Sequence, residues 1–339
     1  MGNCPRQPPN FSISNFPISN FNMKNFITTI IFCTFGAAML YAQQQPANTQ
    51  FMYYKLGYNP GFAGSQESPC VTCIYRQQWL GLDGAPSMAI ATFNMPLNNQ
   101  RVGIGANLYR HTIGITTMYN VDLAYSYRVR LGKGMLGLGI QGSLRSMEQD
   151  FQKTTATQPK EEDGSIPGGT RDKFLFNFGT GLYYNTDKFY IGLSAPRLLE
   201  NNIDYADSDI IISREVQHTY VMGGVTLPIN ASLELKPQAL LKYATGAPID
   251  FDANLSLVIE NSYVVGLTYR LGGNKESGTG ESLDILLAAQ LTKNITFGLS
   301  YDMTISDIKD YSNGSIEASI RYCIGKTEGD KEYVNPRFF

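Results

Sequence analysis

A chain of 339 residues is long enough for one large domain or two of ordinary size. Apolar residues make up 43%, which excludes wholesale disorder, and charged residues only 17%, below the roughly 25% of soluble domains. Lys and Arg (27) nearly balance Asp and Glu (29), so no strong field exists to attract nucleic acid. Low charge with 33 glycines and 21 tyrosines favours many strands, some of which face something other than water.

The N-terminal segment has the layout of a signal peptide. Met23-Lys24-Asn25 precedes a largely apolar stretch, 26–40, and then Tyr41-Ala42-Gln43. The stretch is shorter than the roughly 20 apolar residues of a bilayer-spanning helix. We expect an upstream extension at 1–22 and a signal peptide at 23–42, cleaved after Ala42; a buried N-terminal helix is the alternative.

The segment 43–68 is too polar and too broken to be a strand. Asn59-Pro60 and Gly64 mark turns in it. We therefore expect a periplasmic segment or a plug inside the following domain.

Period-two alternation runs through the rest of the chain. In 119–131 the odd positions are apolar or aromatic, whereas most even positions are polar or charged, which predicts a strand with one face of each kind. The same pattern recurs in 231–243, 263–271, 282–291 and 315–324. Alternation also describes a soluble β-sandwich, so the connections must discriminate.

Fourteen strands are predicted, and short turns alternate with longer loops. The strands are 71–80, 86–96, 101–112, 115–131, 134–150, 172–185, 188–199, 216–228, 231–244, 249–260, 263–272, 281–291, 294–304 and 314–325. Every tight turn follows an even-numbered strand, and the long loops 151–171, 200–215, 273–280 and 305–313 follow odd-numbered ones. This is typical of an antiparallel transmembrane β-barrel. We expect an outer-membrane barrel at 69–325 in contact with lipid, long loops outside the cell, and both termini in the periplasm, including a tail at 326–339.

The predicted lumenal face carries charges of both signs. They are Arg76, Asp122, Arg128, Arg130, Glu234, Lys236, Arg270, Asp284, Glu317 and Arg321. Because charges away from bulk water need partners, this balance predicts an internally bonded or plugged scaffold. A selective pore would show a ring of one sign.

Three motifs near the start of the barrel resemble the PorP/SprF family of type IX secretion outer-membrane proteins. They are Asn59-Pro60-Gly61-Phe62-Ala63-Gly64, Arg76-Gln77-Gln78-Trp79-Leu80-Gly81 and Gly84-Ala85-Pro86. The ends Arg321-Tyr322-Cys323 and Asn335-Pro336-Arg337-Phe338-Phe339 are similar as well. The resemblance implies a barrel that retains or presents a secreted cell-surface protein, including adhesins of gliding motility, and that associates with other type IX components.

Parity assigns faces to the residues of the first strand. Arg76 and Gln78 fall on the lumenal face, and Trp79, the only tryptophan, falls on the lipid-facing side as an anchor in an aromatic girdle. A plug held by Arg76 would explain a charge at that position.

Three cysteines follow the signal peptide, in an oxidising compartment. In a closed barrel the first strand pairs with the last, which brings Cys70 and Cys73 to the height of Cys323. Cys70 shares the lumenal face with Cys323, so an inter-strand disulfide would join Cys70 and Cys323. A local Cys70–Cys73 bridge and three free thiols are the alternatives.

Signs of catalysis are weak. Gly137-Leu138-Gly139-Ile140-Gln141-Gly142 matches a nucleotide-binding pattern, but no helix follows it, so it is interpreted as a strand whose glycines permit close approach. The two histidines, His111 and His218, lie on separate strands. We expect no enzymatic activity, no cofactor and no metal. The predicted function is support of secretion or surface attachment of an exported adhesin-like protein; a porin-like or small-solute transport barrel is the alternative.

Overall fold

The computed structural model describes residues 47–97, 100–153, 169–203, 214–272 and 280–324. The chain divides into two compact units, 1–41 and 42–339, and the fold reported below is that of the second. The predicted extension 1–22, the signal peptide 23–42 and the tail 326–339 lie outside the described residues. None of the helices in the described ranges is long and apolar enough to cross a membrane.

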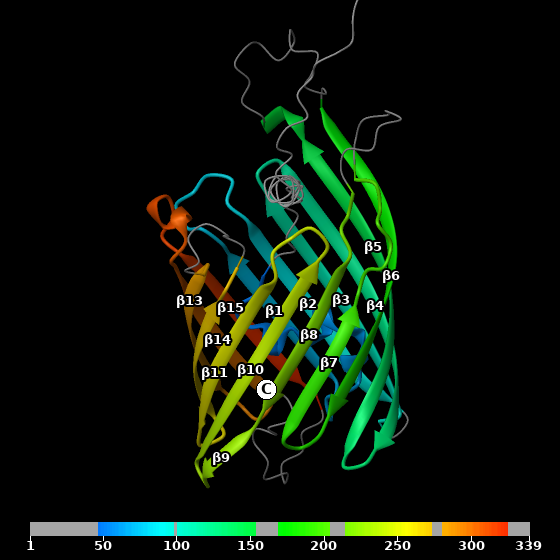
Figure 1. Ribbon diagram of the computed structural model, residues 1–339, viewed down its shortest axis with the longest axis vertical. Helices are drawn as coiled ribbons and strands as arrows, with labels where there is room; N and C mark the ends of the chain where they lie inside the picture. Colours follow the sequence, from blue (N-terminus) through cyan, green and yellow to red (C-terminus); the bar gives the residue numbers. More distant parts are fainter. Residues whose placement is uncertain (1–46, 98–99, 154–168, 204–213, 273–279, 325–339) are drawn as a thin grey trace, which may run out of the picture. The chain divides into compact units, whose positions relative to one another are not determined.

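The described residues of this unit form fifteen strand segments and five short helical segments (Figure 1). The strands are β1 (Cys70–Gln77), β2 (Ser87–Leu97), β3 (Val102–Ile113), β4 (Thr116–Leu131), β5 (Gly134–Asp150), β6 (Thr170–Asn185), β7 (Phe189–Ala195), β8 (His218–Val225), β9 (Leu227–Asn230), β10 (Leu233–Ala244), β11 (Asp250–Ile259), β12 (Tyr263–Arg270), β13 (Ser282–Gln290), β14 (Ile295–Thr304) and β15 (Ser315–Cys323). The helical segments are η1 (Phe51–Tyr53), α2 (Lys55–Tyr58), η2 (Pro60–Phe62), η3 (Phe151–Lys153) and η4 (Asp307–Asp310).

The strands close into a fourteen-stranded antiparallel barrel, as predicted. Except for β8 and β9, which do not pair with each other, each strand pairs with its neighbours along the chain, and β1 pairs with β15 from Cys70↔Cys323 to Gln77↔Ile316. β8 and β9 both pair with β10 and together count as one strand of the barrel, interrupted at Thr226. Pro228, which has no N–H to donate, lies in β9, whose register against β10 shifts between Leu233 and Glu234.

The two faces of the wall differ as a membrane barrel requires. On β4 the outward side chains are exposed and apolar, for example Leu123 at 62% exposure, whereas the inward side chains Asn120, Asp122, Ser126 and Arg128 are buried. The lumenal side chains are therefore sequestered inside the ring, and an apolar band surrounds it.

The barrel has two unlike ends. At the short-turn end the strands join through 98–101, 132–133, 186–188, 231–232, 260–262 and 291–294. At the long-loop end they join through 78–86, 114–115, 151–169, 196–217, 245–249, 271–281 and 305–314.

Two predicted strands, 71–80 and 188–199, end at least three residues earlier than expected. β1 stops at Gln77 because Trp79 has a positive φ of 49°, which cannot continue an extended ladder. β7 stops at Ala195 because Pro196 lacks an N–H. The chain then turns inward, where Gln141 Nε2 donates to Pro196 O (3.4 Å) and Leu198 N donates to Phe178 O (2.9 Å).

Candidate functional site in the barrel lumen

Residues 47–66, which we call the plug, run through the inside of the barrel (Figure 1, blue). Every residue from 48 to 64 except Gly57 is buried. The side-chain oxygen of Asn59 caps η2 by accepting from Gly61 N at 2.8 Å, and Pro60 occupies the first helical position, where its missing N–H carries no penalty. The turns expected from Asn59-Pro60 thus shape a segment that fills the lumen.

Eight charged side chains form a connected network, the ionic ladder, against one end of the plug. They are Arg76, Asp302, Glu317, Arg270, Asp252, Asp284, Lys242 and Asp250. Each lies within two residues of the long-loop end of its strand. The ladder is therefore a half-ring close to that mouth of the barrel, running from β1 through β14 and β12 to β10.

Arg76 links the ladder to the plug. Its guanidinium lies 2.6 Å from Asp302 and 3.2 Å from Glu317, and it donates to Thr49 Oγ1 at 3.0 Å. The Glu317 carboxylate also accepts from the backbone N–H groups of Thr49 (3.1 Å) and Gln50 (2.9 Å). The start of the plug is thereby clamped by charge-assisted hydrogen bonds in a buried setting.

Arg270 and Lys242 continue the ladder. Arg270 Nε lies 2.9 Å from Asp252, and its other nitrogens lie 3.7 Å from Asp284 and Asp302. Lys242 Nζ lies 2.9 Å from both Asp250 and Asp252. Every cation of the ladder thus meets at least two carboxylates, which offsets the desolvation of these buried charges.

The far end of the plug is held by close approach of backbones at the short-turn end. Gly137 and Gly139 of β5 lie against Gly61 and Pro60, so that a Cβ on either would collide with the plug. This is the close approach expected from the glycine-rich strand. Around these contacts, Asn59 Nδ2 donates to Leu182 O (2.9 Å), Gly64 N donates to Asn94 Oδ1 (2.6 Å) and Arg128 donates to Gly64 O.

Lys55 lies in the middle of the plug without a carboxylate partner. Its ammonium has no hydrogen-bond partner among the described residues and lies 3.7 Å from the ring centre of Tyr190 and 5.9 Å from that of Phe62. Burial, together with nearby Arg321 and Lys236, lowers the pKa of Lys55 well below its usual value.

The predicted motif residues occupy three separate places. Asn59, Pro60 and Gly64 belong to the plug, and Arg76 belongs to the ionic ladder. The loop 78–86 at the long-loop end contains the rest, which are Gln78, Trp79, Gly81, Gly84 and Pro86.

Inside this loop, Gln78 N donates to Pro86 O (2.9 Å) and Gly84 O accepts from Gly114 N (2.9 Å). Trp79 is partly buried, and its backbone N–H donates to Ser315 Oγ at 3.2 Å. Gln78 and Trp79 therefore lie beyond the strand whose two faces were expected to carry them.

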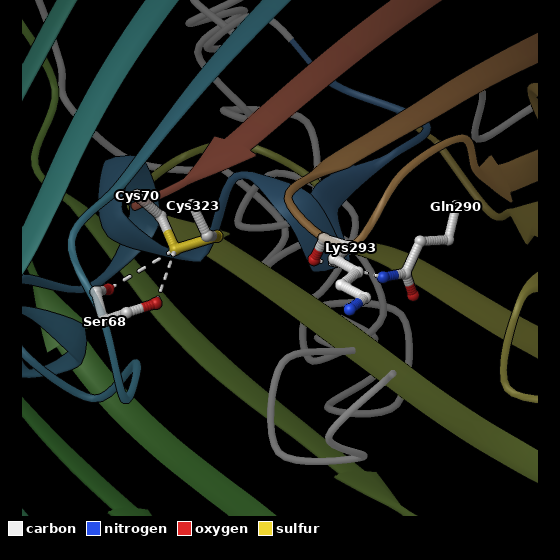
Figure 2. The surroundings of a disulfide bond; sticks show 5 residues. All are labelled: Ser68, Cys70, Gln290, Lys293 and Cys323. Carbon is white, nitrogen blue, oxygen red and sulfur yellow. Dashed lines mark hydrogen bonds between the residues drawn. A yellow bond between two sulfur atoms is a disulfide. The ribbon is translucent and has the colours of Figure 1, made fainter. Parts of the chain in front are cut away.

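A disulfide joins Cys70 of β1 to Cys323 of β15 at the short-turn end (Figure 2). Their Cα atoms are 4.1 Å apart, and the carbonyl oxygen of Ser68 lies 3.4 Å from Cys70 Sγ. Cys73 is exposed and unbridged. The covalent link therefore fastens the seam where the first and last strands meet.

Several residues of the site were not singled out from the sequence. Asp252, Asp302 and Lys242 share the lumenal parity of their strands, so extending the alternation would have found them. Thr49 and Gln50 act through backbone N–H groups, for which residue type gives no sign.

A second buried cluster lies toward the long-loop end, at the inward segment that follows β7. Glu215 Oε1 lies 2.9 Å from Arg145 and 3.8 Å from Arg197, whose Nη2 donates to Tyr109 Oη at 2.9 Å. Glu215, at the end of the loop 200–215, is thus buried in this cluster, whereas 204–213 lie outside the described residues.

The chemistry that this site offers is hydrogen bonding and ion pairing. In the described part of the chain no group of three or more His, Cys, Asp or Glu is placed to hold a metal ion. His218 begins β8 and contacts Val216 O through Nδ1 at 2.8 Å. His111 lies on β3, which is not a neighbour of β8 in the sheet.

Solved structures similar to this chain are membrane barrels at very low sequence identity. A Pseudomonas aeruginosa FadL homologue is 12% identical over 79% of this chain and 93% of its own, with a TM-score of 0.44. A mutant of the TodX monoaromatic hydrocarbon channel is 9% identical over 79% and 93%, with a TM-score of 0.47. KdgM porin is 10% identical over 76% and 99%, with a TM-score of 0.35. No curated protein matches the chain.

A family model identifies the chain where these structures do not. The model of the type IX secretion system membrane protein PorP/SprF matches residues 40–322, a range that includes the plug and nearly the whole barrel. A closed barrel with an apolar outer band is the form in which strands cross the bacterial outer membrane. The chain therefore belongs to the PorP/SprF family of type IX secretion membrane proteins, and its barrel lies in the outer membrane.

Proposed function

We propose that this barrel is a non-enzymatic scaffold of the type IX secretion system that supports secretion or surface attachment of an exported adhesin-like protein. The observation that carries the proposal is the plug. It occupies the lumen from the ionic ladder at one end to Gly137 and Gly139 at the other. A porin-like channel for polar solutes needs a lumen that water fills, whereas a plugged barrel offers its rim and its plug as surfaces.

The loop lengths support the orientation that we propose. Outer-membrane barrels keep their short turns in the periplasm and their longer loops outside. We accordingly place the short-turn end, with the end of β15, in the periplasm, and the long-loop end outside the cell. The exported protein would then dock on the rim formed by 151–171, 200–215 and 305–313, the last of which contains η4. Other type IX components would meet the periplasmic end.

Deletion of 155–168 tests the docking surface. The barrel should remain folded and heat-modifiable on gels, because the deletion leaves β5 and β6 intact, yet an exported surface protein should be lost from the cells. Deletion of 273–279, within the connection between β12 and β13 at the same end, is the matched control and should retain more of the exported protein. Surface proteomics of intact cells gives the readout, with crosslinking and mass spectrometry to identify the bound protein.

Conductance separates the scaffold from the porin-like alternative. The purified full-length barrel in a planar bilayer should show little steady ion conductance because the plug fills the lumen. Steady conductance of an open pore, together with unchanged surface proteins in the 155–168 deletion, would contradict the scaffold and favour solute transport.

A further inference from the structure

A hollow of about 680 Å³ opens at the short-turn end, beside the point where the plug leaves the lumen. Four cationic side chains line it, Arg101, Arg128, Arg130 and Lys133. The two acidic residues on its lining are Glu67 and Asp187, so its walls carry a formal excess of two positive charges. Its size falls within the range of small-molecule binding sites.

The hollow exists because two neighbouring strands differ in length. β4 continues to Leu131, but β3 begins only at Val102, opposite Tyr127, so the last four residues of β4 have no β3 neighbour. Arg128 N donates to Arg101 O at 2.8 Å, which is the last backbone hydrogen bond between β4 and the segment that leads into β3. The resulting notch in the wall is lined by the inward-facing Arg128 as well as by the outward-facing Tyr127 and Val129.

The cations of the notch are paired differently from those of the ionic ladder. Arg128 is buried and donates to Gly64 O and to Asn185 Oδ1 (3.4 Å). Arg101, Arg130 and Lys133 are exposed and take part in none of the ion pairs found within the described ranges. Three cations beside one hollow thus keep their charge available to a ligand, whereas every ladder cation meets two carboxylates.

One wall of the notch belongs to the bilayer-facing surface. Tyr127 and Val129 also line the hollow, and both point outward, with 50% and 41% of their surface exposed. A ligand in the notch would therefore meet cations on one side and the apolar band of the barrel on the other. That combination matches an amphiphile with an anionic head rather than a free ion or an acidic peptide.

We propose that this notch binds an anionic membrane lipid, with the lipid phosphate among Arg101, Arg130 and Lys133 and the acyl region along Tyr127 and Val129. Planar guanidinium groups recognise phosphate oxygens through paired N–H donors, and an ammonium adds a point charge. Because Arg128 also holds Gly64, the lipid would lie directly beside the last anchor of the plug.

Native mass spectrometry of the full-length barrel tests the proposal. Phosphatidylglycerol should bind more tightly than phosphatidylcholine of the same acyl chains, and 10 mM inorganic phosphate should not displace it. One basic residue near a membrane surface changes lipid affinity about fivefold, so Lys133→Gln should weaken phosphatidylglycerol binding by about that factor. Lys293→Gln, in the turn between β13 and β14 at the same end, is the matched control and should change it little.

The triple variant Arg101→Gln, Arg130→Gln, Lys133→Gln should lose about a hundredfold in affinity while its heat-modifiability stays that of the native barrel. Equal binding of the two lipids, or equal effects of the Lys133 and Lys293 variants, would overturn the proposal. Displacement of the lipid by inorganic phosphate, or by an acidic peptide as efficiently as by lipid, would overturn the lipid as the ligand.

Discussion

Arg76 and Asp302 form a 2.6 Å ion pair that reaches across the strand lying between them. Arg76 stands on β1 and Asp302 on β14, and β15 separates these strands in the sheet. Arg76 also contacts Glu317 of β15, so one guanidinium links the three neighbouring strands β14, β15 and β1 at the seam. The same group holds Thr49, which makes closure of the barrel and seating of the plug one connected arrangement.

Arg76→Ala should destabilise the barrel strongly. Removing the guanidinium leaves the carboxylates of Asp302 and Glu317 buried and uncompensated, and loss of one partner of a buried ion pair costs about 3–5 kcal/mol. The temperature at which the folded band converts to the unfolded band on gels measures the change. Arg171→Ala, at an exposed position at the start of β6, is the control and should shift it little. Similar conversion temperatures for both variants would contradict a stabilising role for the seam contact.

Gly139→Val should displace the plug. Gly139 faces Pro60 and Gly61 so closely that a side chain would overlap the plug backbone. Gly142 on the same strand has open space around it, so Gly142→Val introduces the same residue without a collision and is the matched control. Ion conductance in planar bilayers should rise for Gly139→Val alone. Equally low conductance for both variants, with folded barrels, would mean that the plug adjusts its position.

The strand count, the alternation of faces and the closure were predictable because they depend on the period of the side-chain pattern and on the lengths of the turns. A period of two places Asp122 and Arg128 on the face opposite Leu123, and the turn lengths supply the order of the strands. The predicted ends of two strands were wrong because the backbone there cannot continue a β-ladder. The positive φ of Trp79 ended β1, and Pro196 ended β7 and turned the chain inward.

The site was less predictable than the fold. Arg76 was recognised as a lumenal charge able to hold a plug, but its partners came from strands more than 200 residues away. Glu317 holds the plug by accepting hydrogen bonds from backbone N–H groups, which every residue except proline possesses. Such contacts follow from the path of the chain through the lumen, and that path leaves little trace in the pattern of side chains.

Because of Lys55, the free energy of unfolding of the barrel should increase as the pH rises. Burial lowers the pKa of Lys55 well below its usual 10.5, so between the lowered pKa and about 10.5 the unfolded chain binds a proton that the folded chain does not. Stability therefore rises with pH across that window. Lys55→Met removes the buried ammonium and should be more stable than the native barrel at pH 7, with the difference narrowing toward pH 10. Conversion temperatures measured at both pH values give the comparison; a constant difference would contradict burial of a titrating Lys55.

The disulfide should stabilise the seam without being required for assembly. Cys70→Ser opens a link between residues 253 positions apart, and loss of such a native bridge costs about 2–5 kcal/mol. The eight residue pairs between β1 and β15 remain, so the variant should still form a heat-modifiable barrel. Cys73→Ser on the same strand is the control and should have no effect. Peptide mapping without reduction should yield a peptide that joins Cys70 to Cys323, and a Cys70–Cys73 peptide would contradict the seam disulfide.

Labelling of intact cells should distinguish the two ends of the barrel. A cysteine introduced at Gly169, at the long-loop end, should react with a membrane-impermeant maleimide, whereas one introduced at Asn261, in the short turn between β11 and β12, should react only after the outer membrane is opened. The experiment is best done in a Cys73→Ser background, because Cys73 is exposed and unbridged. A protease added outside the cells should likewise cut within 151–171 or 200–215 and spare the turn at Asn99. Reaction at Asn261 in intact cells, with Gly169 protected, would reverse the proposed orientation and move the docking surface to the periplasmic side.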